Sequence, residues 1–252
     1  MTAAPERISI ELTNACGKGC WFCYNGSRPA GETRWTVSQV ETFVRDCAAH
    51  GTRAVSLGGG EPLQWEGLEE LLGRLEGVLF RSLTSNGLLL DEERIGRLVA
   101  ARPDKVHISV HFPGQASEVE RVTGQVLALE AAGVKSGVNL LVQRSKLDEA
   151  AAAAARLRAA GIDNGRIVYL PMRVQDTPTP EQLAVVAGRQ PFQSMSCMLG
   201  CAKSPRFCSV SWDRQAAWCS YTAARRPLEA LTWDGLRRAL DDLPLRFCGG
   251  TE

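Results

Sequence analysis

Short β-rich runs alternate with helical stretches over the first two thirds of the chain, and this alternation limits the fold most strongly. Each predicted helix has apolar residues at helical spacing or is rich in strong helix formers. Strands that alternate with helices form parallel βαβ units. The predicted strands are Ile8–Leu12, Arg53–Leu57, Leu79–Thr84, Lys105–Phe112, Val134–Val142 and Arg166–Leu170, and the predicted helices are Val37–His50, Leu68–Leu75, Glu92–Ala101, Glu118–Ala132 and Leu147–Ala160. Because six strands are too few to close an eight-stranded barrel, we expect an α/β fold with a partial (β/α)6 TIM-like barrel.

The pattern changes after Pro171, where a proline-rich connector at 177–180 precedes shorter elements. We predict a short helix over Glu181–Gly188, a β-hairpin over Phe207–Cys219 and a last helix over Trp233–Leu243. The expected domains are a barrel at residues 1–175 and a small cysteine-rich α+β cap at residues 176–252. A unit this small has little core of its own and generally needs a metal or docking to stay folded.

The overall charge and hydropathy exclude several classes of protein. The 252 residues include 29 Lys and Arg against 28 Asp and Glu, a net charge of +1, which gives no electrostatic footprint for nucleic acid or a membrane surface. No apolar run is long enough to span a bilayer, and the first residues lack the apolar core of a signal peptide. We therefore expect a cytoplasmic protein without nucleic-acid or membrane partners.

Nine cysteines are an unusual number for such a chain. Thiols stay mostly reduced in the cytoplasm, so clustered cysteines indicate metal ligands or redox groups more than disulfides. One group lies near the start, and Cys47 is isolated and expected to be a small buried hydrophobe. The first group is Cys16, Cys20 and Cys23, and the second is Cys197, Cys201, Cys208, Cys219 and Cys248.

The first group has the spacing Cys-x3-Cys-x2-Cys, directly after the first predicted strand. Three thiolates in one loop can bind three corners of a 4Fe-4S cluster and leave the fourth iron open. A zinc site or a closed electron-transfer cluster normally needs a fourth ligand nearby. A structural zinc or ferredoxin-like loop remains the alternative for this spacing taken alone.

This spacing resembles the signature of the radical S-adenosylmethionine (radical SAM) enzymes, in which Phe22 matches the usual aromatic position. The resemblance continues with Gly58-Gly59-Gly60-Glu61-Pro62 after the second strand, where the family carries a Gly-Gly-Glu-Pro motif, and with Ser85-Asn86-Gly87 after the third. It covers residues 7 to about 172. One departure is Gly17, where many relatives have asparagine.

The resemblance implies the chemistry of the site. In this family S-adenosylmethionine chelates the open iron, and one electron from the reduced cluster cleaves it to a 5′-deoxyadenosyl radical that abstracts a hydrogen from the substrate. The barrel orients the substrate and excludes water. A flavodoxin or ferredoxin type reductant is the implied electron donor. The residues expected to bind the cofactor are Phe22, Tyr24, Gly59, Gly60, Glu61, Ser85 and Asn86.

Polar residues alternate with apolar ones on the fourth predicted strand. Lys105, His107, Ser109 and His111 share one face, which we expect to look into the barrel because the opposite face is apolar and must cover the helices. Ser109 is expected to contact S-adenosylmethionine, and His107 or His111 to bind substrate or transfer a proton. The alternative is that the histidines are only hydrogen-bonded within the barrel.

Three later residues complete the expected site. Asn139 on the fifth strand is a candidate for the ribose, and Tyr169 and Arg173 near the sixth could bind substrate, Arg173 through a carboxylate or phosphate. Arg173 could equally pair with a surface acid.

The cysteines of the tail resemble those of the twitch domain, the shortened relative of the SPASM domain that holds one auxiliary 4Fe-4S cluster. The layout is similar to that of short radical SAM dehydrogenases. The resemblance assigns Cys197, Cys219 and Cys248 as ligands, with Cys201 or Cys208 as the fourth. The hairpin turn lacks the family's glycine, and a four-cysteine zinc site is the alternative.

These features favour a radical SAM oxidoreductase that acts on a small metabolite in a biosynthetic pathway, with the auxiliary cluster taking the second electron. A maturase that forms a thioether or carbon–carbon cross-link in a peptide substrate is the second possibility. A non-catalytic iron–sulfur or zinc scaffold is the third, from a different class of protein.

Overall fold

In a computed structural model, residues 4–199, 201, 203–204 and 206–245 are described, so Cys248 lies outside the described residues. The chain forms two compact units, one of residues 1–105 with 203–246 and the other of residues 106–202 with 247–252. These groupings differ from the division at residue 175 that composition suggested, because the tail from residue 203 onward packs with the beginning of the chain.

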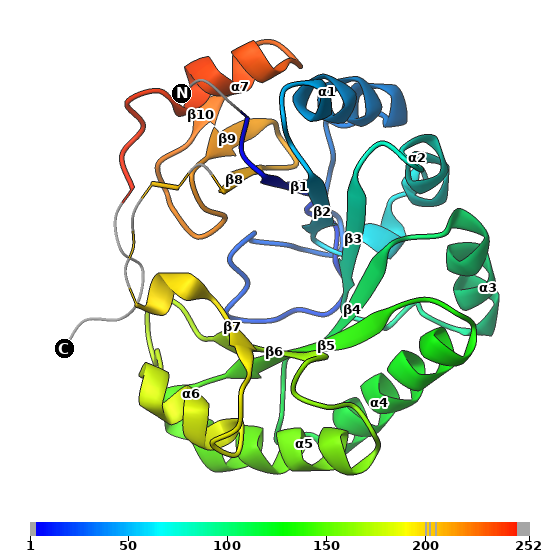
Figure 1. The fold of residues 1–252 in the computed structure, drawn as a ribbon, viewed down its shortest axis with the longest axis vertical. Coiled ribbons are helices and arrows are strands. Elements are labelled where there is room, and N and C mark those ends of the chain that lie inside the picture. The colour runs from blue at the N-terminus through cyan, green and yellow to red at the C-terminus, as the bar shows by residue number, and fades with distance from the viewer. Residues whose placement is uncertain (1–3, 200, 202, 205, 246–252) are drawn as a thin grey trace. The chain divides into compact units, whose positions relative to one another are not determined.

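The first unit starts with parallel βα repeats, as predicted. Strands β1, β2 and β3 pair in parallel in that order, and the helices lie outside them (Figure 1). The elements are β1 Arg7–Thr13, α1 Val37–Ala49, β2 Ala54–Gly59, the 3-10 helix η1 Pro62–Gln64, α2 Leu68–Arg74, β3 Phe80–Ser85 and α3 Glu92–Ala101.

The tail of this unit extends the same sheet. Strands β8 Phe207–Val210 and β9 Gln215–Ala217 form the predicted antiparallel hairpin, followed by β10 Arg226–Pro227 and by α7 Trp233–Leu240. Unexpectedly, β8 pairs in parallel with β1, so the strand order of the unit is β10-β9-β8-β1-β2-β3. The tail was expected to need docking to stay folded, and it docks through the backbone pairing of β8 with β1.

Apolar residues on one face of β1 and β8 explain this pairing. Ile8 and Ile10 are fully buried, and they are aligned in register with the equally buried Cys208 and Val210. Alternate strand residues share a face, so Cys208 belongs to the apolar layer. Cys47 of α1 is fully buried, as expected. Burial raises the pKa of the Cys208 thiol well above its usual value, and the nearby Cys47 adds to this effect.

Hydrogen bonds of three tryptophans hold the tail together and join it to the rest of the first unit. The indole of Trp35 donates to the carbonyl of Ser211 at 3.0 Å, and that of Trp218 donates to the carbonyl of Leu240 at 3.1 Å. The backbone N–H of Trp233 donates to the Asp46 carboxylate of α1 at 2.5 Å. Buried indoles whose N–H groups are paired combine a large apolar area with a fixed orientation, which holds α7 and the hairpin in place.

The second unit continues the βα pattern, and β4, β5, β6 and β7 pair in parallel in that order. Val106, Ile108 and Val110 are fully buried, which confirms the predicted apolar face of β4. The elements are β4 Lys105–Val110, α4 Ala116–Ala131, β5 Ser136–Val142, η2 Arg144–Lys146, α5 Leu147–Ala159, β6 Ile167–Pro171, α6 Pro180–Val186, β7 Gln193–Ser194 and η3 Ser196–Met198.

Helix caps set the beginnings of several helices. The side chain of Thr36 accepts from the N–H of Gln39, whose side chain accepts from the Thr36 N–H in return, which forms a capping box at the start of α1. Thr179 and Gln182 form the same arrangement before α6. Such caps satisfy backbone donors that the first helical turn leaves unpaired.

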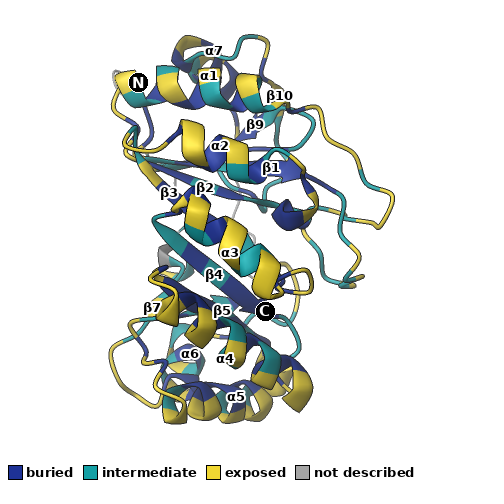
Figure 2. Ribbon diagram, turned by 90° about the vertical axis from the view of Figure 1, so that its right-hand side faces the viewer, coloured by how far each residue is buried: buried dark blue, intermediate teal, exposed yellow. Residues whose placement is uncertain are grey.

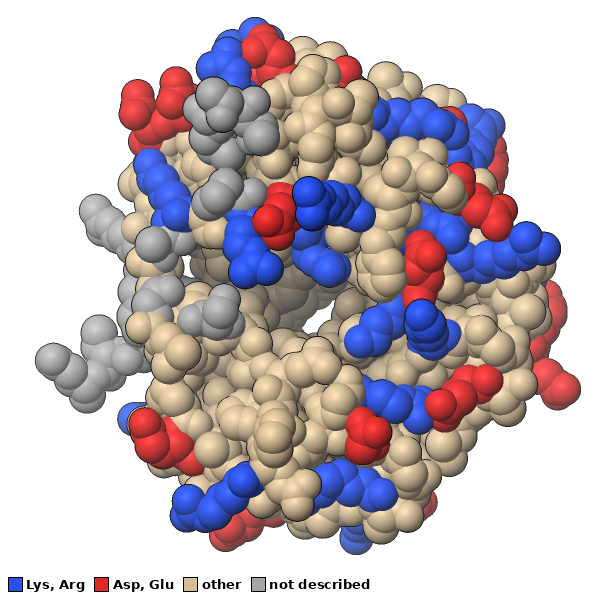
Figure 3. Space-filling model, viewed as in Figure 1, with Lys and Arg blue, Asp and Glu red and all other residues tan. Residues whose placement is uncertain are grey.

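Burial follows the expected amphipathic pattern, with the buried faces of the helices turned towards the strands and the exposed faces outward (Figure 2). On the face drawn in Figure 3, basic and acidic side chains are interspersed, as the net charge of +1 leads one to expect. Among the described residues, no helix has the length and apolar character needed to cross a membrane.

Candidate cofactor site at the end of strand β1

The cysteine loop leaves β1 at an irregularity in the sheet. Glu11 pairs with Gly58 and Thr13 pairs with Gly59, so β1 carries one extra residue over this step. Such bulges are common next to active sites, where they redirect the chain. The base of the loop is held by backbone hydrogen bonds from Asn14 N–H to the Glu32 carbonyl at 3.0 Å and from Cys16 N–H to the Arg28 carbonyl at 2.9 Å.

The three cysteines of this loop form no disulfides and are of intermediate exposure. The N–H of Cys23 donates to the carbonyl of Cys20 at 3.1 Å, and Gly19 adopts a φ of +68°, which turns the loop tightly between the first two cysteines. Burial raises the pKa of the Cys16 thiol, and the charges of Glu61 and Cys23 add to this effect.

As the side chains stand, no three His, Cys, Asp or Glu residues in the described part of the chain converge closely enough to hold a metal ion. The cysteine loop does not need such convergence to hold a 4Fe-4S cluster, because each cysteine would bind a different iron. Its donor set fits that group, because three half-exposed thiols are available and a fourth iron would remain open.

The glycine motif after β2 lies directly against the base of this loop. A Cβ on Gly60 would overlap the backbone carbonyl of Ala15, and one on Gly59, whose φ is +109°, would lie 2.6 Å from the Thr13 carbonyl oxygen. The backbone N–H of Gly60 donates to the Thr13 carbonyl at 2.6 Å, and that of Glu61 donates to the Ala15 carbonyl at 2.7 Å. Glycine is required here because the two backbones touch.

The carboxylate of Glu61 is occupied by the protein itself. It is buried and accepts hydrogen bonds from the Ser85 hydroxyl at 2.8 Å, from the Asn86 N–H at 2.8 Å and from the Leu63 N–H at 3.0 Å. Burial raises the pKa of Glu61, and these three donors oppose that shift. Glu61 thus joins the glycine motif to the end of β3, and its geometry suits a positioning role.

The end of β3 also reaches the first cysteine. The side-chain amide of Asn86 donates to the sulfur of Cys16 at 3.4 Å, while its oxygen accepts from the Leu88 N–H at 2.8 Å. Hydrogen bonds to cluster sulfurs orient the ligands and tune the potential of iron–sulfur sites. The structure therefore brings together the three motifs on which the family resemblance rested, all within the first unit.

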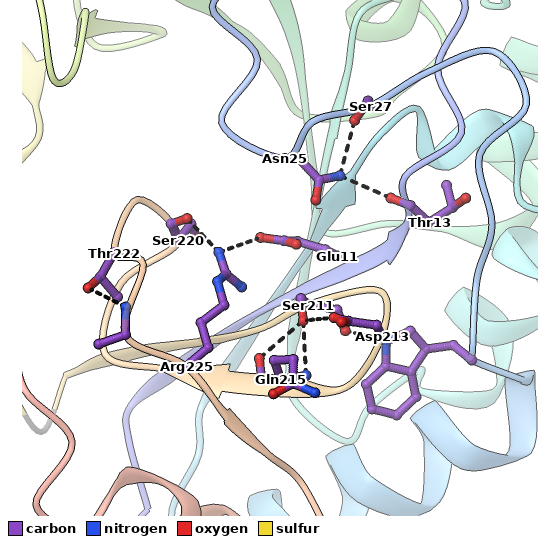
Figure 4. A network of polar contacts seen from close by, with 12 residues as sticks. Glu11, Thr13, Asn25, Ser27, Ser211, Asp213, Gln215, Ser220, Thr222 and Arg225 are labelled. Carbon is purple, nitrogen blue, oxygen red and sulfur yellow. Dashed lines mark hydrogen bonds and ion pairs between the residues drawn. The ribbon is translucent and has the colours of Figure 1, made fainter.

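Glu11 was not anticipated from the sequence, yet it lies beside the loop and is as deeply buried as Glu61, with 1% of its surface exposed. Its Oε1 lies 3.7 Å from Nη2 of Arg225, a residue of the tail (Figure 4). Burial is the largest cause that raises the pKa of Glu11 to about 7; Arg225 opposes it and Asp213 adds to it. A lone acid on a strand of apolar and hydroxyl residues was the signal that could have revealed it.

Two tyrosines lie close to this acid. The rings of Tyr24 and Tyr221 have centroids 5.0 Å apart. Burial of the Tyr24 hydroxyl raises its pKa well above the usual value, and the charges of Glu11, Tyr221 and Cys23 contribute to the increase. The residue after Cys23 therefore links the cysteine loop to the tail. Phe22, the aromatic residue before Cys23, packs edge to face with Trp21 instead, with centroids 5.3 Å apart.

In the second unit, the polar residues of β4 lie beside β5. Ser109 is paired in register with Asn139 of β5, so the two residues expected to contact S-adenosylmethionine are neighbours. His107 is aligned with Gly137, where a Cβ would lie 3.0 Å from the imidazole. The missing side chain of Gly137 thus makes room for the His107 ring. His111 follows the end of β4, and its backbone N–H donates to the Glu118 carboxylate at 2.6 Å.

The structure corrects the expectation for Tyr169. This residue is fully buried, its hydroxyl donates to the Asn164 side chain at 2.7 Å, and the same hydroxyl accepts from Arg158 at 3.0 Å. Its ring also packs against Phe192. Because Tyr169 shares the helix-covered face of β6 with the buried Ile167, it is a core residue and not a substrate ligand.

Within the residues that the structure describes, Arg173 pairs with no surface acid. It is 5% exposed, and its guanidinium donates to the sulfur of Cys197 and, at 3.2 Å, to the sulfur of Met198. Its Nε is buried without a hydrogen-bond partner in the described part of the chain. The predicted substrate ligand is therefore directed at the first cysteine of the tail.

The other tail cysteines differ in accessibility. Cys201 and Cys219 are of intermediate exposure, whereas Cys208 lies in the apolar layer of β8 and is fully buried. Cys201 is thus better placed than Cys208 to serve as a ligand.

Comparison with protein families places the chain in a class of enzymes. The profile of the Radical SAM superfamily matches residues 10–177, and the chain belongs to this superfamily. Membership implies a 4Fe-4S cluster and S-adenosylmethionine as cofactors, and the cysteine loop described above is the site that fits them.

Among characterised relatives, the probable GTP 3',8-cyclase of Sulfolobus acidocaldarius is 35% identical over 108 residues, which cover 42% of this chain and 34% of that protein. The AdoMet-dependent heme synthase of Methanosarcina barkeri is 30% identical over 162 residues, 59% of this chain and 46% of that protein. In these matches the chain spans between a third and a half of its relatives.

Solved structures share the fold over most of the chain. SuiB of Streptococcus suis bound to S-adenosylmethionine aligns with a TM-score of 0.74 and 14% identity, over 96% of this chain and 67% of that one. BtrN in complex with AdoMet and 2-DOIA aligns with a TM-score of 0.51 and 15% identity, over 88% of this chain and 75% of that one. The fold is the partial TIM-like α/β barrel predicted from the sequence.

Substitution of Gly60, whose backbone touches the cysteine loop, should disable the cofactor site, whereas substitution of Gly58 should not. We expect Gly60→Ala to displace the Ala15 carbonyl and to lose most of the iron bound after reconstitution. Gly58→Ala is the matched control, because a Cβ there meets nothing within 4 Å. Iron content per chain measures the effect, and equal iron in both variants would contradict the close-contact argument.

The buried Glu11 predicts a pH dependence of stability. Its pKa in the folded chain is raised above the unfolded value of 4.5, so its stabilising contribution is complete below pH 4.5 and is lost as pH rises through about 7. The unfolding free energy of the wild type relative to Glu11→Gln should therefore fall by roughly 2 kcal/mol from pH 5 to 8.

Glu41→Gln provides the control for this measurement. The pKa of Glu41 is lowered, mainly by its hydrogen bonds with Arg74 and Arg45, so this carboxylate stays ionised across most of the same range. Anaerobic denaturation at several pH values would give the comparison. A difference between wild type and Glu11→Gln that does not change with pH would show that Glu11 does not titrate in this window.

Proposed function

We propose that this radical SAM enzyme oxidises a small metabolite and that its tail holds an auxiliary 4Fe-4S cluster. The observation that supports the auxiliary cluster is the buried Arg173 guanidinium against the sulfur of Cys197. The cofactors would supply a 5′-deoxyadenosyl radical and, through the auxiliary cluster, an acceptor for the second electron of the oxidation. The residues of the chain bind these groups and orient the substrate.

At the first site, Cys16, Cys20 and Cys23 would ligate the catalytic cluster. Asn86 would donate a hydrogen bond to the Cys16 sulfur, as it does in the structure. The backbone around Gly59 and Gly60 would bind the methionine end of S-adenosylmethionine, since the Glu61 carboxylate is already occupied by its three donors. Ser109 and Asn139 are proposed to contact the same cofactor, and His107 and His111 the substrate.

The environment of Arg173 supports an anionic group in the tail. A buried cation is costly unless a negative charge compensates it. In the described part of the chain no carboxylate forms an ion pair with Arg173, and its nearest polar partners are the sulfurs of Cys197 and Met198. A metal-bound thiolate at Cys197 would supply the missing charge. We assign Cys201, Cys219 and Cys248 as the remaining ligands in preference to Cys208.

A peptide substrate is the second candidate function. The SuiB structure bound to the precursor peptide SuiA covers 96% of this chain with a TM-score of 0.73, against 0.51 for the BtrN complex with 2-DOIA. We therefore keep a peptide substrate as a candidate, in which the enzyme would form a thioether or carbon–carbon cross-link with the same clusters. A flavodoxin or ferredoxin type protein is proposed as the electron donor in either case.

Loss of one ligand should abolish the cofactor chemistry. We expect Cys20→Ala to stop formation of 5′-deoxyadenosine from S-adenosylmethionine by the reduced, reconstituted protein. Cys47→Ala is the control, because Cys47 is a fully buried thiol in the apolar layer. Chromatography of the nucleoside product gives the readout, and continued formation by Cys20→Ala would contradict the assignment.

The metal content should reveal the auxiliary cluster. Two clusters correspond to about eight iron and eight sulfide per chain, whereas about four of each would remove the auxiliary cluster from the proposal. We expect Cys201→Ser to lose about half of the iron and Cys208→Ala to keep it. The opposite result would exchange the roles of these two cysteines, and stoichiometric zinc would replace the cluster with a structural zinc site.

The substrate class can be tested by isotope transfer. Candidate polyols, cyclitols and short peptides labelled with deuterium would be incubated with the reduced enzyme and S-adenosylmethionine. Deuterium in 5′-deoxyadenosine identifies a molecule from which the radical abstracts hydrogen. Transfer from peptides and not from metabolites would favour the second candidate function.

A further inference from the structure

We propose that Glu11 and Arg225 form a binding site for a hydroxyl group of the substrate. The two side chains point towards each other from β1 and from the segment that follows β9 (Figure 4). This inference rests on the proposed oxidation of a small metabolite and narrows its substrate to a hydroxylated molecule.

The pair is poorly matched as an ion pair. Nη2 of Arg225 and Oε1 of Glu11 are 3.7 Å apart, which is too long for a hydrogen bond. In the described part of the chain, Oε1 of Glu11 and Nη1 of Arg225 are both buried without a hydrogen-bond partner. A buried ion pair stabilises a protein only when its geometry is good and its remaining polar atoms are satisfied. This pair meets neither condition.

The pKa of Glu11 agrees with incomplete pairing. Burial raises it to about 7 although Arg225 lowers it, so the guanidinium does not fully compensate the carboxylate. The charged groups that act on Glu11 are Arg225 from the tail and Asp213 from the hairpin turn. A native structure that leaves such a buried donor and acceptor unsatisfied calls for an explanation, and an absent ligand provides one.

The chemistry of the two groups selects the ligand. A carboxylate accepts and a guanidinium donates, so the missing group must donate to one and accept from the other. A hydroxyl oxygen does both, and one atom can lie about 2.8 Å from each of two atoms that are 3.7 Å apart. A carbonyl or carboxylate cannot donate to the ionised form of Glu11, which prevails above its pKa of about 7, and an ammonium cannot accept from Arg225.

The position of the pair relates it to the catalytic loop. Tyr24, which follows Cys23, lies close enough to Glu11 and Arg225 for their charges to alter its pKa. Tyr24 as a whole is 44% exposed, although its hydroxyl is buried, and its ring packs against that of Tyr221. This aromatic pair beside a buried acid and a partly exposed arginine offers an apolar wall for the carbon skeleton of a polyol, with the hydroxyl held next to the cysteine loop.

A ligand would reach Glu11 by displacing the side chain of Arg225. Its side chain is 21% exposed, and within the described residues its guanidinium makes one hydrogen bond, from Nη2 to the Ser220 carbonyl at 2.7 Å. A rotation of this long side chain breaks that one hydrogen bond and loosens the long contact with Glu11. The ligand hydroxyl then replaces that contact with two charge-assisted hydrogen bonds.

The experiment uses reconstituted protein with S-adenosylmethionine bound and three probes in saturation-transfer NMR. The probes are myo-inositol, which offers hydroxyl groups, N-acetylglycinamide, which offers amides, and acetate, which only accepts. We expect saturable binding of myo-inositol that Glu11→Gln and Arg225→Met each weaken about tenfold, the loss expected for a charge-assisted hydrogen bond.

The controls separate binding from folding. Glu41→Gln removes an exposed carboxylate paired with Arg74 and Arg45, and it should leave inositol binding unchanged. Arg225→Lys keeps a donor and should restore part of the affinity lost in Arg225→Met. Circular dichroism and binding of S-adenosylmethionine report the integrity of each variant.

Each outcome has a defined meaning. Amide binding in place of inositol, with the same sensitivity to both substitutions, would overturn the hydroxyl assignment in favour of a peptide group. Retained inositol binding in both variants, or no probe binding by intact wild type, would show that the pair is only a structural link between β1 and the tail. Failure of the wild type to bind S-adenosylmethionine would instead contradict the proposed function itself.

Discussion

The contact between two backbones, that of the glycine motif and that of the cysteine loop, is the constraint on which the candidate site depends. Gly59 and Gly60 lie against Thr13 and Ala15 with no room for a side chain. From this contact the Glu61 carboxylate extends to the end of β3, whose Asn86 reaches back to the first cysteine. Three segments distant in sequence are thereby held around one small region, and a single added methyl group would separate them.

The tail belongs to the same sheet as the candidate site. Strand β8 adds to the edge of β1, the strand from which the cysteine loop departs, so the sheet that carries the catalytic loop also carries the hairpin. This pairing buries Cys208 with the apolar layer. It also brings Arg225 close to the buried Glu11 of β1, and Tyr221 close to Tyr24 of the cysteine loop. The proposed substrate contacts exist only because the tail docks there.

Local sequence patterns predicted the repeats well. The alternation of strands and helices, the apolar face of β4 and the hairpin of the tail agree with the structure because each depends on residues close together in the chain. The prediction that Tyr169 binds substrate was wrong. A tyrosine near a strand end suggests a ligand, but the hydroxyl of Tyr169 is hydrogen-bonded to Asn164 and Arg158 in the core. Glu11 was missed because its partner lies more than 200 residues away in sequence.

The sequence by itself determined the class of enzyme, because the spacing of the first three cysteines and the glycine motif resemble the signature of the radical SAM family. Cluster ligation and close backbone approach need those residue types. Tertiary structure alone decided which polar groups remain available. In the folded chain the carboxylate of Glu61 accepts hydrogen bonds from the protein itself, and Arg173 donates to Cys197. Glu11 faces Arg225 without a hydrogen bond to it. The physical reason is that hydrogen bonding and burial are properties of neighbours in space, which strand pairing selects and local sequence does not encode.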